Sequence, residues 1–272
     1  MKPPGRELAV AARAPLRLAY AAWTALLFLA VGGVALFSQL VLPRLALRRA
    51  TARAAARLFL ALAGMPVTVK FPERLPAGQC MVVCNHASYL DGIVLTAALP
   101  ARFGFVIKRE MAAVPLAAVL LRRLGSEFVE RFDRARGATD ARRVLRSAIQ
   151  GRSLVFFPEG TFTRSPGLLR FHTGAFAAAA RVGCPLVPAV LRGTRRALAP
   201  SGALPRPGAL ELEILPSLEP GDVTADQAPM LLRDRARAAM LAALGEPDLT
   251  CCDDTGRPPG TAPPRSARAS RP

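Results

Sequence analysis

The residues of this sequence best suited to chemistry are a histidine and an aspartate five positions apart, in the stretch Asn-His-Ala-Ser-Tyr-Leu-Asp at residues 85–91. The apolar run before it, residues 81–84, is typical of a buried strand. On a continuous helix, residues five apart point about 140° away from each other, so the two side chains meet only if a turn separates them. With His86 in a turn and Asp91 near the start of a helix, Asp91 can hold one imidazole nitrogen and leave the other free as a general base.

The spacing alone fits a second interpretation equally well, a polar turn in which Asp91 binds backbone donors and His86 lies near the surface. The rest of the chain favours the catalytic interpretation. Polar clusters stand at the ends of expected strands: His86 with Asp91, Lys108 with Arg131, and residues 159–164. Sites in α/β domains gather where strands end and loops begin, so we expect these clusters to converge.

Segments typical of strands alternate with segments typical of helices over residues 65–245, which indicates an α/β domain with helices on both faces of a sheet. The expected strands lie at 67–71, 81–84, 103–107, 127–129, 153–157, 186–191 and 209–215. Asp140 is expected to cap a helix that runs to about Gln150. Residues 246–272 are rich in Pro, Arg and Gly with little to bury, and we expect a disordered tail.

The first 64 residues differ from the rest because no charged residue occurs from Leu18 to Leu42. That length matches a membrane span, and Tyr20 and Trp23 near its start fit an interfacial belt. The alternatives are a secretory signal peptide, whose apolar region would be shorter and followed by a cleavage site, and a long buried core helix. We expect a membrane anchor.

Three arginines after this segment, Arg49, Arg53 and Arg57, are four residues apart and share one helical face. This pattern fits a helix lying on an anionic membrane surface, or the solvated face of a core helix; its position beside the apolar segment favours the membrane. The basic residues on the two sides of the apolar segment are nearly balanced, so they leave the topology open. We expect the catalytic domain at the cytoplasmic face.

The composition limits the partners. The formal charge is +18, but only three of the 37 basic residues are lysines, so the Arg, Ala and Pro content indicates compositional drift. A basic surface still favours anionic partners such as phospholipid headgroups. Aromatic residues make up 6% of the chain without basic-aromatic interleaving, so no nucleic-acid partner is expected. The five cysteines lack zinc-site spacing and indicate free thiols in a reducing compartment, so we expect no metal.

Four blocks in order resemble the lysophosphatidic acid acyltransferase family of membrane-bound glycerolipid acyltransferases, over about residues 67–215. They are residues 85–91 (NHASYLD), 125–131 (GSEFVER) preceded by 108–111 (KREM), 157–161 (FPEGT) and 186–189 (LVPA). Residues 171–176 (FHTGAF) also resemble the family's segment beyond the third block. The resemblance implies the glycerolipid-acyltransferase-type mixed sheet flanked by helices, with a membrane-anchoring segment before it.

The resemblance also implies a reaction, acyl transfer from acyl-CoA or acyl-carrier protein to the free hydroxyl of a lysophospholipid, foremost lysophosphatidic acid. The thioester is a substrate, so no cofactor is expected. His86 would take the proton of that hydroxyl and Asp91 would orient the imidazole. Cationic side chains would hold the acceptor phosphate, and the turn after the fifth expected strand would shape the acceptor pocket with backbone donors. The residues implied for these two roles are Lys108, Arg131 and Arg164, and Glu159, Gly160 and Thr161.

One position departs from the family. Its third block usually reads Glu-Gly-Thr-Arg-Ser, with the Arg on the acceptor phosphate, whereas this chain has Phe162, Thr163 and then Arg164. Either Arg164, two residues further along the chain, binds the acceptor phosphate in place of that Arg, or the acceptor has less phosphate character, for example an amino-acid lipid. A third hypothesis, from another class, is a catalytically silent membrane-anchored protein that binds anions.

Overall fold

The computed structural model of the chain describes residues 5–130, 134–202, 204–221 and 227–250, and for residues 5–13 and 134–138 it describes the backbone alone. The helices are α1 (Gly5–Val41), α2 (Leu45–Leu62), α3 (Asp91–Ala98), α4 (Pro115–Arg123), α5 (Arg134–Ile149), α6 (Gly174–Val182), α7 (Thr194–Ala197) and α8 (Ala228–Leu244). The strands are β1 (Val67–Lys70), β2 (Met81–Cys84), β3 (Gly104–Lys108), β4 (Glu127–Val129), β5 (Leu154–Phe156), β6 (Leu186–Arg192) and β7 (Leu210–Ile214). Two short 3-10 helices lie at Pro72–Arg74 and Arg109–Ala113.

The strands form one seven-stranded sheet in the order β1-β7-β6-β2-β5-β3-β4. Neighbouring strands run parallel except β6 and β7, which are antiparallel, so the expected mixed sheet is confirmed. Strand β2 lies at the centre, with Met81 opposite Leu154 of β5 on one side and opposite Leu186 of β6 on the other. Because β2, β5 and β3 are adjacent and parallel, their carboxyl ends meet at one edge of the sheet.

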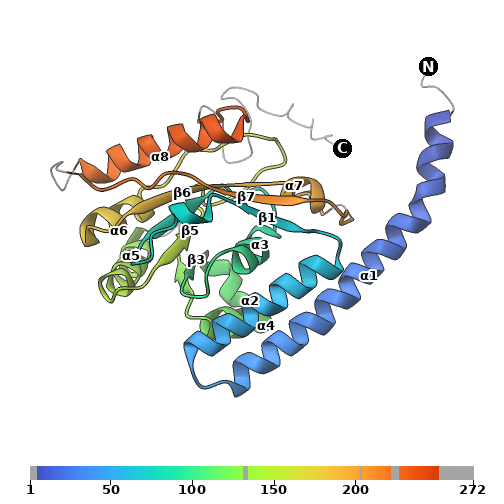
Figure 1. Cartoon of the computed structure of the whole chain (residues 1–272), viewed down its shortest axis with the longest axis horizontal. Coiled ribbons are helices and arrows are strands. Elements are labelled where there is room, and N and C mark those ends of the chain that lie inside the picture. The colour runs from blue at the N-terminus through green and yellow to red at the C-terminus, as the bar shows by residue number, and fades with distance from the viewer. Residues whose placement is uncertain (1–4, 131–133, 203, 222–226, 251–272) are drawn as a thin grey trace, which may run out of the picture.

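The two faces of the sheet build two cores, as the period of two along a strand requires. Val82 and Cys84 of β2 pack with α2 and α3, whereas Met81 and Val83 pack with α5, α6 and α8. All four side chains are fully buried. In Figure 1, α8 and α6 cover one side of the sheet, and α3, α2 and α4 lie on the other. Apolar burial on both faces explains why β2 is a continuous apolar run.

The N-terminal helices form an antiparallel hairpin that lies beside the α/β domain (Figure 1). Tyr20 Oη donates to the carbonyl of Ala63 at 2.6 Å, and Gln39 Nε2 donates to the carbonyl of Arg48 at 3.2 Å. Within α1, residues Ala14–Val41 are long and apolar enough to cross a membrane, and 22% of their most apolar window is buried against the protein. The segment expected to cross the membrane therefore lies in α1, and most of it is not covered by the described rest of the protein.

The arginine face of α2 makes contacts within the protein that the sequence did not predict. Arg57 Nε donates to the carbonyl of Ala97 at 2.9 Å, and Arg53 Nη2 to that of Ala98 at 3.4 Å. Both acceptors belong to the last residues of α3, where carbonyls lack helical partners and the helix dipole favours cations. Arg49 reaches two further carbonyls of the domain. The regular spacing correctly predicts a shared face, but that face binds helix ends of this same chain.

Two further expectations need correction. Asp140 lies inside α5, which begins at Arg134, so it does not cap that helix. The first residues of the expected tail are held by the domain: Asp248 pairs with Arg237 of α8 at 2.6 Å, and Glu246 pairs with Arg195 of α7 at 2.7 Å. Residues 251–272 of that tail lie outside the described part of the chain.

Candidate active site

The histidine and aspartate meet across the turn between β2 and α3, as their spacing predicts. His86 Nδ1 lies 2.7 Å from Asp91 Oδ2, which also accepts the backbone N–H groups of Ala87 at 2.6 Å and Ser88 at 2.8 Å. Asp91 is completely buried. A carboxylate oxygen can only accept a hydrogen bond, so the imidazole nitrogen 2.7 Å from it is the donor. Nδ1 then carries the hydrogen, and Nε2 is left free to accept a proton.

The turn that carries His86 is fixed by distant segments. The side chain of Asn85 donates to the carbonyl of Leu191 in β6 at 3.0 Å and accepts the N–H of the same residue at 2.7 Å. Ser88 Oγ donates to the carbonyl of Leu198 at 2.7 Å. These bonds satisfy buried polar groups and hold the turn against the strand beside β2.

Glu159 connects the turn after β5 to the backbone of His86. Its Oε1 accepts the N–H of His86 at 2.7 Å, and its Oε2 accepts the N–H of Leu169 at 2.9 Å. Burial raises the pKa of Glu159 from 4.5 to about 7, although the two N–H donors and nearby Arg195 act in the opposite direction. Glu159 lines the expected pocket, but both of its oxygens already hold backbone donors, so it braces the two loops against each other.

Two aromatic rings pack directly on the imidazole of His86, and a third packs behind one of them. Phe157 stacks on His86 with ring centroids 4.2 Å apart and planes 18° apart. Phe162 meets the same ring edge to face at 4.4 Å and 74°, and Tyr89 packs on Phe162 at 4.8 Å. These contacts were not predicted from the sequence, although Phe157 directly follows β5, the strand paired with β2. The residue that departs from the family, Phe162, therefore lies against the expected catalytic base.

A cavity of about 670 Å³ opens at the imidazole and extends between the N-terminal hairpin and the domain. Side chains from α1, α2, α3, β3 and α4 line it, most of them apolar. Phe28 comes from α1 and Phe59 from α2, while Ile93 and Leu121 come from the domain. The N-terminal helices thus form a wall of the site, which no pattern in the sequence predicts. Helical periodicity shows which residues share a face but not which surface that face meets.

The structure brings some of the expected substrate-binding residues together and leaves others apart. Lys108, Glu159, Gly160 and Thr161 line the cavity with His86. Gly160 has φ +76°, a conformation that favours glycine, and its N–H donates to the carbonyl of Phe157 at 3.0 Å, so it is not an available anion donor. Arg164 is exposed and is not among the residues that line the cavity, and Arg131 lies outside the described residues.

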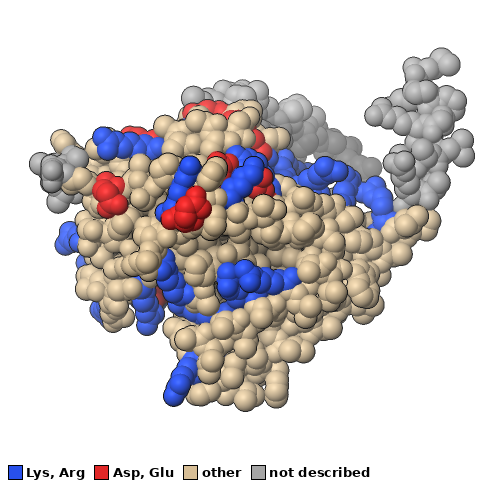
Figure 2. Space-filling model, in the orientation of Figure 1, with Lys and Arg blue, Asp and Glu red and all other residues tan. Residues whose placement is uncertain are grey.

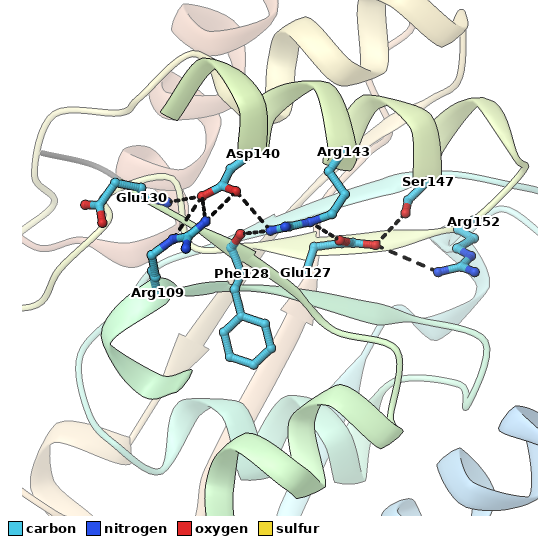
Figure 3. A network of polar contacts seen from close by, with 8 residues as sticks. All are labelled: Arg109, Glu127, Phe128, Glu130, Asp140, Arg143, Ser147 and Arg152. Atoms are coloured by element: carbon cyan, nitrogen blue, oxygen red, sulfur yellow. Dashed lines mark hydrogen bonds and ion pairs between the residues drawn. The ribbon is translucent and has the colours of Figure 1, made fainter. Parts of the chain in front are cut away.

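A polar network beside the site holds β4 against α5 (Figure 3). Arg109 pairs with Asp140 at 2.8 Å, and the same carboxylate accepts the N–H of Glu130 at 2.9 Å. Burial raises the pKa of Asp140, but these hydrogen bonds lower it more, so its pKa lies below the usual range. Glu127 binds Arg143 at 3.0 Å in the same network. Arg109 is therefore a fixed structural partner, whereas its neighbour Lys108 lines the cavity.

Comparison with known proteins supports the resemblance to acyltransferases. Residues 66–192 match the family model described as Acyltransferase, a range that contains the His86–Asp91 pair, Lys108 and the turn at Glu159. This part of the chain, just under half of its length, is similar to that family. The resemblance seen in the four sequence blocks is thereby confirmed.

Individual relatives agree with this resemblance. The chain is 32% identical over 133 residues to the 1-acyl-sn-glycerol-3-phosphate acyltransferase BAT2 of Brassica napus, covering 48% of this chain and 38% of that protein. It is 30% identical over 172 residues to the putative 1-acyl-sn-glycerol-3-phosphate acyltransferase acl-2 of Caenorhabditis elegans (62% and 60%). It is 33% identical over 133 residues to the lyso-ornithine lipid O-acyltransferase of Pseudomonas aeruginosa (47% and 49%). The chain thus spans between 38% and 60% of the length of these relatives.

A solved structure shares the fold. The 1-acyl-sn-glycerophosphate acyltransferase PlsC from Thermotoga maritima superposes with a TM-score of 0.69 and 22% identity, covering 86% of this chain and 95% of that one. The expected α/β acyltransferase architecture is confirmed by this match.

Proposed function

We propose that this protein transfers a fatty acyl group from a thioester, acyl-CoA or acyl-carrier protein, to the free hydroxyl of a lysophospholipid, foremost lysophosphatidic acid. One observation carries the proposal: the His86 imidazole, held by buried Asp91 at 2.7 Å, lines an apolar cavity of about 670 Å³. That volume is typical of a small-molecule site, and its lining suits an alkyl chain, which gains about 0.8 kcal/mol per buried methylene.

The geometry of the His86–Asp91 pair supports the following proton steps. Nε2 of His86 accepts the proton of the acceptor hydroxyl as its oxygen attacks the thioester carbonyl, and Asp91 stabilises the imidazolium that forms. When the tetrahedral intermediate collapses, the carbon–sulfur bond breaks and the imidazolium returns the proton to the thiolate. The ester and a free thiol are the products, and no acyl-enzyme is required.

The acceptor headgroup is the point at which two candidate functions differ. Lys108, exposed at the wall of the cavity, supplies fixed positive charge for a phosphate, which supports lysophosphatidic acid. Phe162 occupies the position of the family's phosphate-binding Arg and packs on His86 instead. This contact favours the second candidate, an acceptor with less phosphate character such as an amino-acid lysolipid, and one relative is a lyso-ornithine lipid O-acyltransferase.

We also propose that the enzyme works at a membrane, with its N-terminal hairpin in or on the bilayer. Large apolar side chains are exposed along α1 and α2. The surface over the middle of α1 is largely free of charge in Figure 2, whereas basic side chains lie along α2. Contiguous apolar surface of this kind marks a membrane or protein contact, and both substrates are amphiphilic. The exposed residues include Leu18, Leu26, Leu29, Val34, Phe37, Leu40, Leu58 and Leu62.

The decisive experiment measures thiol release from acyl-CoA by detergent-purified protein across a panel of lysolipid acceptors, with His86→Ala alongside. Release with lysophosphatidic acid, absent in the variant, supports the first candidate; release only with an amino-acid lysolipid supports the second. Silence with acyl-CoA and with acyl-carrier protein donors contradicts both and favours a binding protein.

Membrane association is tested separately by flotation with phospholipid vesicles. Leu26→Asp with Phe37→Asp, two substitutions on exposed positions of α1, should reduce vesicle binding strongly. Met230→Asp, on an equally exposed apolar position of α8, is the matched control and should leave binding unchanged. Equal binding of all three proteins contradicts the role of the hairpin.

A further inference from the structure

The loop between β5 and α6, residues 157–173, supplies a part of the cavity wall that contacts the base. Glu159 of this loop accepts the backbone N–H of His86 at 2.7 Å, and Phe162 packs on the imidazole. Glu159 also accepts the N–H of Leu169, further along the same loop, at 2.9 Å. The position of Leu169 therefore bears on Glu159, and through Glu159 on the turn that carries the base.

The last helix of the domain holds this loop through Arg237 of α8. The Nε of Arg237 donates to the carbonyl of Leu169 at 3.2 Å, and its Nη2 donates to the carbonyl of Leu168 at 3.0 Å. Both leucines are buried, so their carbonyls would lose a strong partner if the guanidinium were absent. Because the N–H of Leu169 binds Glu159, a continuous path of hydrogen bonds runs from α8 to His86.

The segment that follows α8, residues 245–250, binds both Arg237 and the loop, and we call it the latch. The carboxylate of Asp248 accepts two hydrogen bonds from Arg237, at 2.6 and 2.9 Å. Leu168 donates its backbone N–H to a latch carbonyl and accepts the N–H of Leu249, each at 3.0 Å, in a parallel bridge. The latch thus fixes the guanidinium and the loop backbone at the same point.

The loop is shaped to receive the latch. The N–H of Gly167 donates to Glu246 of the latch at 2.7 Å, and the other oxygen of this carboxylate binds Arg195 at 2.7 Å. Gly167 has φ +141°, and a Cβ at this position would lie 2.5 Å from the side chain of Leu249. A glycine is required here because Leu249 packs directly on its backbone.

We propose that Arg237 is a positioning residue that, together with the latch, holds residues 157–173 against the base in the position that receives the acceptor lysolipid. The inference rests on the proposed function, in which His86 is the base and residues 159–162 line the acceptor side of the cavity. Most of the apolar lining comes instead from α1, α2, α3 and α4. Release of the loop should therefore impair use of the acceptor more than use of the thioester.

The test measures kcat and KM for both substrates in Arg237→Ala, with the acceptor that the wild-type enzyme uses. A loop that is in its binding position for a smaller fraction of the time lowers the apparent affinity by that fraction. The KM for the acceptor should rise by about tenfold, the effect of losing one charged hydrogen bond, while the KM for the thioester keeps its wild-type value. Arg233→Ala is the matched control, because Arg233 lies one turn earlier on α8 and pairs with Asp234 of its own helix at 2.8 Å. It should leave both KM values unchanged.

A second variant keeps the proposal testable if Arg237→Ala does not fold. The side chain of Asp248 is 43% exposed, so Asp248→Ala opens no cavity, but it removes the carboxylate that fixes Arg237. The KM for the acceptor should rise by about threefold, as for the loss of a partly exposed ion pair. Since the two residues act on the loop together, the double variant should have the acceptor KM of Arg237→Ala alone. An unchanged acceptor KM in either active variant, an equal rise in both KM values, or the same rise in Arg233→Ala overturns the inference.

Hydrogen exchange measured by mass spectrometry separates the two proposals because it requires no activity. The N–H of His86 is bound by Glu159, so its exchange reports whether the loop is held against the base. In Arg237→Ala, peptides covering residues 85–90 and 157–173 should exchange faster, whereas peptides of β7 should not. This pattern, with a wild-type protein that transfers nothing, supports the positioning role of Arg237 and contradicts the proposed function. Unchanged exchange at loop and base, or faster exchange that includes β7, overturns the inference whatever the activity.

Discussion

Replacing Asp91 by asparagine removes one negative charge from the site while leaving its shape almost unchanged. Three N–H groups converge on Oδ2, from His86 Nδ1, Ala87 and Ser88, so the amide oxygen of the variant must occupy that position. The amide nitrogen then takes the place of Oδ1, which is buried without a hydrogen-bond partner among the described residues. The imidazole therefore keeps its hydrogen on Nδ1, and Nε2 remains the base.

The variant loses the charge that faces the imidazolium in the transition state. At a separation of about 4 Å and an effective dielectric constant of about 20, that attraction is ~4 kcal/mol. Since about 1.4 kcal/mol corresponds to tenfold in rate, turnover of Asp91→Asn should fall by roughly 10²- to 10³-fold. A reversed tautomer would cost more, about 10⁴-fold in serine proteases. The buried amide N–H groups should also lower the free energy of unfolding by about 1–3 kcal/mol.

The assay is thiol release under saturating substrates, with His86→Ala as the baseline and thermal unfolding measured by circular dichroism. A fall of less than about tenfold refutes the role of the Asp91 charge. A fall to the His86→Ala baseline in a variant that unfolds normally refutes the argument that the tautomer is kept.

Three other changes test the surroundings of the base. Burial raises the pKa of Glu159 from 4.5 to about 7, so the folded protein binds that proton more tightly than the unfolded chain does. The free energy of unfolding should therefore fall as the pH rises from about 4.5 to about 7. Urea titrations at several pH values measure this dependence, and Glu159→Gln should remove it. Phe162→Arg should raise the ratio of turnover with phosphate-bearing acceptors to turnover with phosphate-free acceptors by about tenfold, because a charged hydrogen bond is worth about 1.5–3 kcal/mol. The same ratio in Phe162→Arg and in the control Phe162→Leu would contradict this. Lys108→Met should raise KM for lysophosphatidic acid by about tenfold without changing KM for the thioester, and equal effects on both would remove Lys108 from the acceptor site.

Local features of this protein were predictable from the sequence. The His86–Asp91 contact depends on a five-residue turn, and the central strand is visible as the buried run Met81–Cys84. The alternation of helix-like and strand-like segments predicted the α/β sheet. The polar clusters at the strand ends predicted that Lys108 and Glu159 line the same cavity as His86.

The remaining features depend on contacts between distant segments. Glu159 and His86 are 73 residues apart, and Arg49 and Leu124 are 75 residues apart. No local pattern specifies such pairs, because propensity and periodicity act within one element. The arginine face of α2 illustrates the limit: a cationic face suits an anionic membrane and helix C-termini equally well, and only the tertiary structure distinguishes them.

The central position of β2 has a consequence for how the protein is made. The turn at Asn85 is held by Leu191, 106 residues later in the chain, and synthesis of that interval takes roughly 5–20 s at ordinary translation rates. The apolar hairpin α1–α2 leaves the ribosome before the α/β domain, whereas the base is fixed only after β5 and β6 have paired on both sides of β2. Under the proposed membrane role of the hairpin, the segment that contacts the bilayer is therefore synthesised well before the proposed catalytic site is complete.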